Sequence, residues 1–291
     1  FRSIKAMMIL MCCMVHNFAH ASTVQFKINN TDIQQQSCVQ LAIEDFKSLL
    51  EKNTDTKFVN SSAADVTIEF IKKTNFTNAI AFDSIAKYSG FEWSTQQVNN
   101  EVRLLLSASS YKGFANGLYA LLQEKIGFKF YHAREMLTPK QKQIEWKSIE
   151  SFSGYPVFEK MGFHIHSMHP LELTESLLDE KSPNALNNIK EYIDWLAHNG
   201  QNYFEFNLLE SIDKKNWIAH AQQITAYAHS KGIFCGVDLS IHMIQQKAFQ
   251  LYSGMANKNK KIIKNANWLL AANFDVWNVE LSTTEFSQGN Q

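Results

Sequence analysis

The stretch Met161-Gly-Phe-His-Ile-His166 opens a pattern that recurs three more times and decides the fold. Each repeat is a short apolar run followed by a segment with the apolar spacing of an amphipathic helix. The further runs are Tyr203-Phe-Glu-Phe-Asn-Leu-Leu209, Ile233-Phe-Cys-Gly-Val-Asp-Leu239 and Phe274-Asp-Val-Trp-Asn-Val-Glu-Leu281. Strands that alternate with helices are typical of βαβ units around a parallel sheet. Residues 155–291 are therefore predicted to form the first half of a (β/α)8, or TIM, barrel.

Each predicted strand carries polar side chains near its carboxyl end. In (β/α)8 enzymes the side chains at these ends converge on the active site. We therefore expect one cavity to gather the following residues: His164, His166, Glu205, Asn207, Asp238, His242 and Glu280.

The number of repeats is smaller than a closed barrel requires. A barrel needs about eight units and typically ~250 residues, whereas the sequence ends at Gln291 after the fourth strand. It also begins with Phe1 and not with Met. We expect a fragment with an incomplete barrel, which is itself inactive, so that a predicted activity belongs to the parent protein.

Residues 1–21 have the features of a secretory signal peptide. Arg2 and Lys5 form a basic start, residues 6–15 are apolar and uncharged, and Ala19-His20-Ala21 gives a small-x-small cleavage pattern. The run is shorter than the ~20 residues that span a bilayer. The expected mature protein therefore begins at Ser22 and is secreted or periplasmic.

Two other interpretations of this segment remain open, a buried amphipathic helix and a lipid anchor. The lipid anchor is disfavoured because Met11 precedes Cys12 where a lipid-attachment motif needs a small residue. Cleavage would leave two cysteines, Cys38 and Cys235, one in each predicted domain. Two separate cysteines form no disulfide framework.

Charge excludes some classes of partner. The chain has 28 basic and 28 acidic residues, without a Lys/Arg-rich stripe interleaved with aromatic residues. This balance argues against binding to nucleic acid or to an anionic membrane surface. The oligomeric state cannot be predicted from it.

Residues 22–150 are predicted to form a separate α/β domain. Its elements follow the order strand, helix, strand, strand, helix, strand, a βαββαβ arrangement with helices on one face of a small sheet. The predicted strands cover residues 23–28, 66–71, 101–106 and 128–131, and the predicted helices cover residues 32–52 and 111–125. No acids, bases or metal ligands cluster there, which indicates structural support or contact with the substrate from the side.

This domain carries a family resemblance. The segment Gly113-Phe-Ala-Asn-Gly-Leu-Tyr-Ala-Leu-Leu-Gln123, followed by Gly127-Phe-Lys-Phe-Tyr131, resembles the amino-terminal domain of family 20 β-N-acetylhexosaminidases and of α-glucuronidases. In those glycoside hydrolases a small α/β domain precedes a catalytic (β/α)8 barrel. The resemblance implies a carbohydrate substrate and no cofactor.

The barrel segments resemble family 20 in part. The family's third strand ends in Asp-x-Pro-Gly-His, and Asp238-Leu-Ser-Ile-His242 keeps the acid and the imidazole at that spacing. The family's first-strand Arg-Gly is Met161-Gly162 here, and the Asp that follows is replaced by His166. The adjacent Asp-Glu of the fourth strand becomes Val279-Glu280. The resemblance therefore implies a relative that acts on a sugar other than an N-acetylhexosaminide.

The proposed chemistry needs carboxyl groups. Glycoside hydrolysis uses a carboxylic acid to protonate the leaving oxygen and commonly a second carboxylate. Glu280 is the candidate general acid and Glu285 the candidate second carboxylate, although that group could also lie outside this sequence. Trp277 or His242 could raise the pKa of Glu280 or stack on a sugar ring.

Two rival functions start from other features. His164-x-His166 at the end of a first barrel strand resembles the metal-binding signature of amidohydrolases, with His169, His242 and Glu280 as possible further ligands. The lack of the Asp-Glu pair is also compatible with a non-catalytic carbohydrate-binding protein. Our preferred prediction is a metal-free glycosidase.

Overall fold

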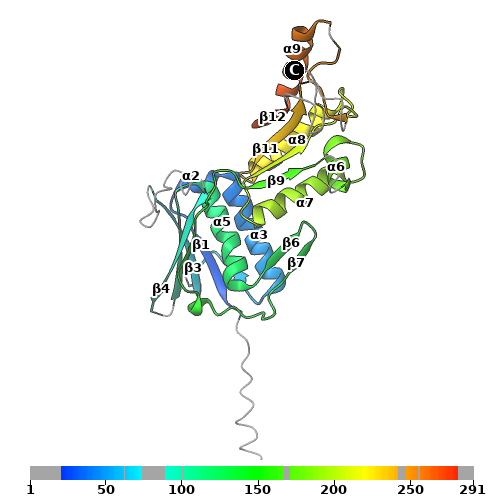
Figure 1. The fold of residues 1–291 in the computed structure, drawn as a ribbon. Coiled ribbons are helices and arrows are strands. Elements are labelled where there is room, and N and C mark those ends of the chain that lie inside the picture. Colours follow the sequence, from blue (N-terminus) through cyan, green and yellow to red (C-terminus); the bar gives the residue numbers. More distant parts are fainter. Residues whose placement is uncertain are drawn as a thin grey trace, which may run out of the picture.

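The computed structural model describes residues 21–61, 63–73, 89–99, 101–166, 171–241, 247–254 and 256–280. These residues form an α/β structure with two larger sheets, an amino-terminal mixed sheet and a carboxyl-terminal parallel sheet. Figure 1 shows the amino-terminal sheet with helices on one face and the parallel sheet extending away from that layer. The predicted fold class is therefore confirmed. None of the described helices is long and apolar enough to cross a membrane.

The amino-terminal sheet has six strands in the order β2-β1-β3-β5-β4-β8. The neighbours from β2 to β5 run parallel, whereas β4 is antiparallel to both β5 and β8. The strands are β1 (Thr23–Lys27), β2 (Lys57–Phe58), β3 (Val66–Lys72), β4 (Phe91–Val98), β5 (Glu101–Ala108) and β8 (Phe152–Gly154).

Helices α3 (Ser37–Asn53) and α5 (Tyr111–Leu121) cover this sheet side by side. The buried face of α3 has helical spacing, with Val39, Ala42, Phe46 and Leu50 all at most 1% exposed. The predicted helix over residues 32–52 is interrupted at Gln36, which is extended and separates α2 (Thr31–Gln35) from α3. This interruption lies in a polar stretch, so it exposes no apolar surface.

One predicted strand of this domain lies outside the six-stranded sheet. The predicted strand over residues 128–131 is β6 (Lys129–His132), which pairs in a separate hairpin with β7 (Glu135–Leu137). The backbone carbonyl of Phe130 accepts hydrogen bonds from the side chains of Trp195 and Asn199 in and beside a later helix, at 3.0 and 3.1 Å. Strands β4 and β8, which the sequence analysis missed, complete the sheet instead.

The carboxyl-terminal sheet confirms the four predicted strands. It is parallel throughout, in the order β12-β11-β10-β9. Its strands are β9 (Gly162–Ile165), β10 (Tyr203–Asn207), β11 (Phe234–Ser240) and β12 (Val276–Glu280), and its helices are α6 (Leu171–Leu178), α7 (Ala185–His198), α8 (Trp217–Ser230) and α9 (Lys258–Leu270). The described strands do not close into a barrel.

Polar contacts fix the amino-terminal layer against the helices of the parallel sheet. His198 Nε2, at the end of α7, lies 2.6 Å from Asp45 Oδ2 in α3. The buried Lys112 of α5 donates to the carbonyl of Lys231, just after α8, at 3.4 Å. These helix ends lie at the amino ends of the strands, opposite the carboxyl ends that carry the predicted site residues.

Candidate functional site

The register of the parallel sheet creates one polar face. Glu205 lies opposite His164, Asn207 lies opposite Asp238, and Glu280 lies opposite Ser240 on the neighbouring strand. Because side chains alternate across a strand, residues two apart share a face. This alternation joins the three pairs into one surface, which we call the polar face: His164, His166, Tyr203, Glu205, Asn207, Asp238, Ser240, Asn278 and Glu280.

The other face of the sheet is apolar and packs against the helices. Phe204, Phe206 and Val237 are at most 1% exposed. Trp277 lies opposite Val237 in the register and packs against this core. The predicted contact of Trp277 with a substrate on the polar face is therefore corrected, because Trp277 and Glu280 are three residues apart on one strand and point to opposite faces.

A hydrogen-bonded chain links three side chains of the polar face. His164 Nδ1 lies 2.8 Å from Glu205 Oε1, and the Tyr203 hydroxyl donates to Glu205 Oε2 at 2.5 Å. Both oxygens of the Glu205 carboxylate therefore have a partner on the polar face. Burial, followed by the hydrogen bond and charge of Glu205, raises the pKa of Tyr203, which keeps the hydroxyl a donor.

Gly236 makes room for this arrangement. A Cβ atom at Gly236 would overlap the hydroxyl oxygen of Tyr203 and lie 3.0 Å from the Cβ of Glu205. Tyr203 therefore lies across the neighbouring strand because residue 236 has no side chain. The space left by the glycine lets the Tyr203 hydroxyl reach the carboxylate of Glu205.

Asp238 is the most perturbed carboxyl group of the polar face. Burial and, second to it, the nearby charge of Glu280 raise its pKa to about 6, while His164 opposes the shift. The side chain is 6% exposed, and its Oδ1 has no hydrogen-bond partner among the described residues. Asn207 Oδ1 and Ser240 Oγ are likewise buried without a partner in that part of the chain. Shifted pKa values and buried acceptors without a hydrogen-bond donor are typical of binding and catalytic sites.

The remaining predicted site residues are placed as follows. Glu280 is half-buried at the last residue of β12, and the exposed His166 ring lies 6.3 Å from the His164 ring, between centroids. His169, His242 and Glu285 lie outside the described residues. Over the described ranges, no three His, Cys, Asp or Glu side chains are arranged to hold a metal ion.

Sequence reasoning missed three members of the polar face, namely Tyr203, Ser240 and Asn278. Each lies two residues from a predicted site residue on the same strand: Glu205, Asp238 and Glu280, respectively. The period of two along a strand was the signal that could have found them.

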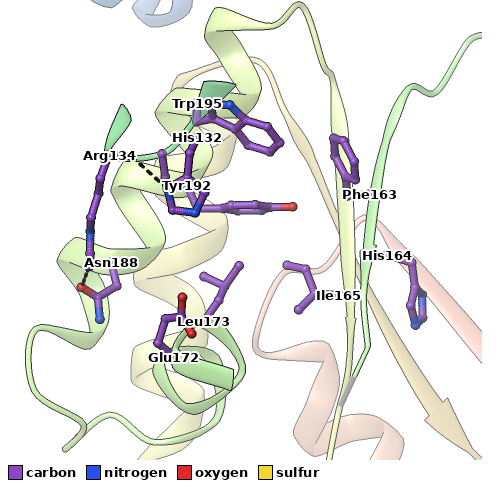
Figure 2. A pocket seen from close by; sticks show the side chains of 11 residues that line it. His132, Arg134, Phe163, His164, Ile165, Glu172, Leu173, Asn188, Tyr192 and Trp195 are labelled. Carbon is purple, nitrogen blue, oxygen red and sulfur yellow. Dashed lines mark hydrogen bonds between the residues drawn. The ribbon is translucent and has the colours of Figure 1, made fainter. Parts of the chain in front are cut away.

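A separate cavity of about 350 Å³ lies beside the edge strand β9 (Figure 2). It is lined mainly by Phe163, Tyr192 and Trp195, with Arg134 from the β6–β7 hairpin at its rim. In Figure 2, His164 lies on the opposite side of β9 from Tyr192 and Trp195. The aromatic lining of this cavity therefore lies on the helix side of the sheet, and His164 is the residue that it shares with the polar face.

No protein-family model and no curated protein matches this sequence. Among solved structures, the chain is similar to a family GH115 4-O-methyl-α-glucuronidase with specificity for decorated arabinogalactans, at 12% identity and a TM-score of 0.50, over 74% of this chain and 28% of that one. The fold is glycoside hydrolase-like.

Two further solved structures have lower TM-scores. A GH138 enzyme targeting pectin rhamnogalacturonan II is 11% identical, with a TM-score of 0.49, over 78% of this chain and 25% of that one. A β-N-acetylhexosaminidase from Bacteroides fragilis is 15% identical, with a TM-score of 0.45, over 76% of this chain and 41% of that one. The chain thus spans between a quarter and about two fifths of these structures. The predicted resemblance is confirmed for the fold, whereas membership of family 20 stays a prediction.

Proposed function

We propose that the polar face is the substrate site of a glycoside hydrolase of carbohydrate metabolism, active in the polypeptide that carries the complete barrel. The observation that carries this proposal is the placement of Asp238 and Glu280 on one face of the neighbouring strands β11 and β12, where the charge of Glu280 raises the pKa of Asp238. Glycosidic bond cleavage needs one carboxyl group that holds a proton and one that is ionised. Asp238, whose pKa is raised to about 6, and Glu280 place two carboxyl groups on one face.

The two carboxyl groups differ in position. Asp238 lies opposite Asn278 in the register, and Glu280 lies two residues beyond Asn278. Glu280 is therefore nearer the carboxyl ends of the strands than Asp238. The leaving oxygen of a substrate that enters from this end meets Glu280 first. We therefore propose Glu280 as the general acid, with Asp238 beneath it as a charged neighbour. Glu285 stays a candidate second carboxylate on sequence grounds alone.

The test is Glu280→Gln in the full-length polypeptide, since Gln keeps the size of the side chain but has no transferable proton. General acid catalysis typically contributes about 10²–10⁴ in rate, and we expect a loss of this order for natural-type oligosaccharides. Aryl glycosides with good leaving groups need the proton least, so their loss should be smaller. Equal losses for both substrate types, or an activity removed by chelator and restored by zinc, would reject the proposal.

We also propose export, on the sequence pattern of residues 1–21. Mass analysis of the mature protein should find Ser22 or a close neighbour at its amino terminus. Recovery of secreted protein that retains residues 1–21 would contradict this.

A further inference from the structure

We propose that the polar face binds a sugar with a free, protonated amino group, in preference to an N-acetylated sugar or a uronic acid. This inference rests on the proposed carbohydrate site and adds the class of substrate. It follows from the charges and the unmatched hydrogen-bonding atoms of the face.

The first argument is the charge of the polar face. Three carboxyl groups, Glu205, Asp238 and Glu280, lie on three neighbouring strands, and their charges act on one another. The register of the described strands places no Lys or Arg on this face. Only His164 and His166 could offset the negative charge. A cation would therefore be attracted here, and a uronate would be repelled.

The second argument is the set of atoms without partners. Asp238 and Ser240 are 6% and 1% exposed, and Asp238 Oδ1, Asn207 Oδ1 and Ser240 Oγ lack partners within the described residues. An ionised carboxylate and an amide oxygen can only accept, and a hydroxyl can accept as well as donate. Buried acceptors without donors cost free energy. A ligand rich in donors compensates for this cost.

An ammonium group fits both arguments better than its alternatives. It brings a positive charge and three N–H donors to a surface of acceptors, and hydrogen bonds between charged partners are roughly twice as strong as neutral ones. An acetamido group brings one N–H donor, an additional acceptor and no charge. A uronic acid adds another carboxylate. The polar face therefore discriminates among sugars by the charge on the group that approaches Asp238.

The experiment measures binding of three probes to the full-length polypeptide near neutral pH by titration calorimetry or ligand-observed NMR. The probes are a glucosamine oligosaccharide, the same oligosaccharide fully N-acetylated, and an oligogalacturonide of similar length. We expect the free amine to bind at least about tenfold more tightly than the acetylated probe, which corresponds to about 1.4 kcal/mol. The oligogalacturonide should bind most weakly.

Two variants and an acid titration locate the effect. Asp238→Asn should remove the preference for the amine, whereas Glu124→Gln, which changes an exposed carboxylate in another layer, should preserve it. In the unmutated protein, lowering the pH from about 7 to about 5 should weaken amine binding, because protons are taken up by Asp238. Glu280 and Glu205 on the neighbouring strands and His164 on β9 act on the charge of Asp238, and His166 lies on the same face. Acid keeps the sugar amine protonated, so the loss reports on the protein.

Each outcome has a defined meaning. Equal binding of the free and acetylated probes, tighter binding of the oligogalacturonide, or no binding of the amine overturns the inference. A preference that survives both Asp238→Asn and acid also overturns it. Tight, selective binding of the amine without any hydrolysis supports this inference while rejecting the proposed hydrolase function. Hydrolysis of neutral glycosides with no preference for amines supports the proposed hydrolase function and rejects this inference.

Discussion

The amino-terminal sheet pairs its carboxylates with cations, whereas the parallel sheet pairs Glu205 with His164 and Tyr203 but gives Asp238 no Lys or Arg among the described residues. In the amino-terminal sheet, Glu69 pairs with Lys27 at 3.0 Å and Glu101 pairs with Arg103 at 3.3 Å. Glu92 bonds to both Lys73 and Tyr155. Although burial opposes the shift, the hydrogen bonds from Lys73 and Tyr155 lower the pKa of Glu92. These carboxylates are satisfied by their surroundings.

The parallel sheet leaves Asp238 in the opposite state. Burial and the neighbouring Glu280 raise its pKa, and no Lys or Arg of the described polar face compensates it. Both sheets use parallel strands covered by helices, so the backbone does not explain the difference. The difference lies in the partners that the side chains meet. Glu92 has Lys73 and Tyr155 as partners, whereas Asp238 Oδ1 has none among the described residues, which agrees with the ligand site proposed there.

The largest stability effect that we expect within this comparison comes from Gly236→Ala. The added methyl group would overlap the Tyr203 hydroxyl, and overpacking a close-packed site typically costs about 1–3 kcal/mol. Gly117→Ala in α5 is the matched change in the other layer, where the new Cβ would meet the methyl groups of Leu106, the mobile end of a side chain. Ala is also favoured over Gly in a helix by about 1 kcal/mol. The cost at Gly117 should therefore be smaller.

Urea unfolding of both variants measures this difference. Tyr203→Phe removes the hydroxyl that the new methyl group meets, so the pair Gly236→Ala with Tyr203→Phe should recover part of the loss. A fully additive double variant would show that Tyr203 does not lie over Gly236.

The next effect concerns Asp238→Asn. The pKa of Asp238 is about 6 in the folded protein, above its ordinary value of 3.8. The folded state therefore favours the protonated form. This contribution to stability is present below the ordinary pKa and is lost as the pH rises from 3.8 to about 6. Asn does not titrate in this range. The free energy of unfolding of Asp238→Asn, relative to that of the unmutated protein, should therefore rise by about 1–2 kcal/mol from acid to neutral pH.

Free energies of unfolding at a series of pH values between about 4 and 7 test this prediction. Only the difference between the two proteins matters, because other groups titrate in both. Parallel curves would show that Asp238 is no more strained than an exposed aspartate.

The parallel sheet could be predicted from the sequence because the same apolar pattern occurs four times. Each of the four strands begins in a short apolar run, and each of the first three runs is followed by helical spacing and then by another run. The polar residues Glu205, Asp238 and Glu280 then stand out against their neighbours. Their shared face follows from parallel pairing in register, which explains why they could be predicted before the structure.

The wrong predictions concern Trp277, strand β4 and the β6–β7 hairpin. The positions of Trp277 and Glu280 differ by three, an odd number, so one strand cannot present both side chains on one face. Strand β4 was missed because only its first half alternates in a buried pattern, with Phe91 and Trp93 inside and the later Gln96 and Gln97 exposed. The β6–β7 hairpin depends on contacts of Phe130 with α7 and Asn199 that no local pattern encodes.

The smallest effect that we expect, and the one with the opposite sign, comes from Glu92→Gln. Glu92 has a lowered pKa, so its contribution to stability is present above the ordinary value of 4.5 and is lost as the pH falls through the lowered value. Partly exposed ion pairs contribute about 0–1 kcal/mol, and we expect a loss of that size at neutral pH that disappears in acid. Glu124→Gln, at an exposed carboxylate, serves as the control and should show neither change. If Glu92→Gln were instead to stabilise the protein at neutral pH, as Asp238→Asn should, the contrast between paired and unpaired carboxylates in the two sheets would fail, because both would then be strained by burial alone.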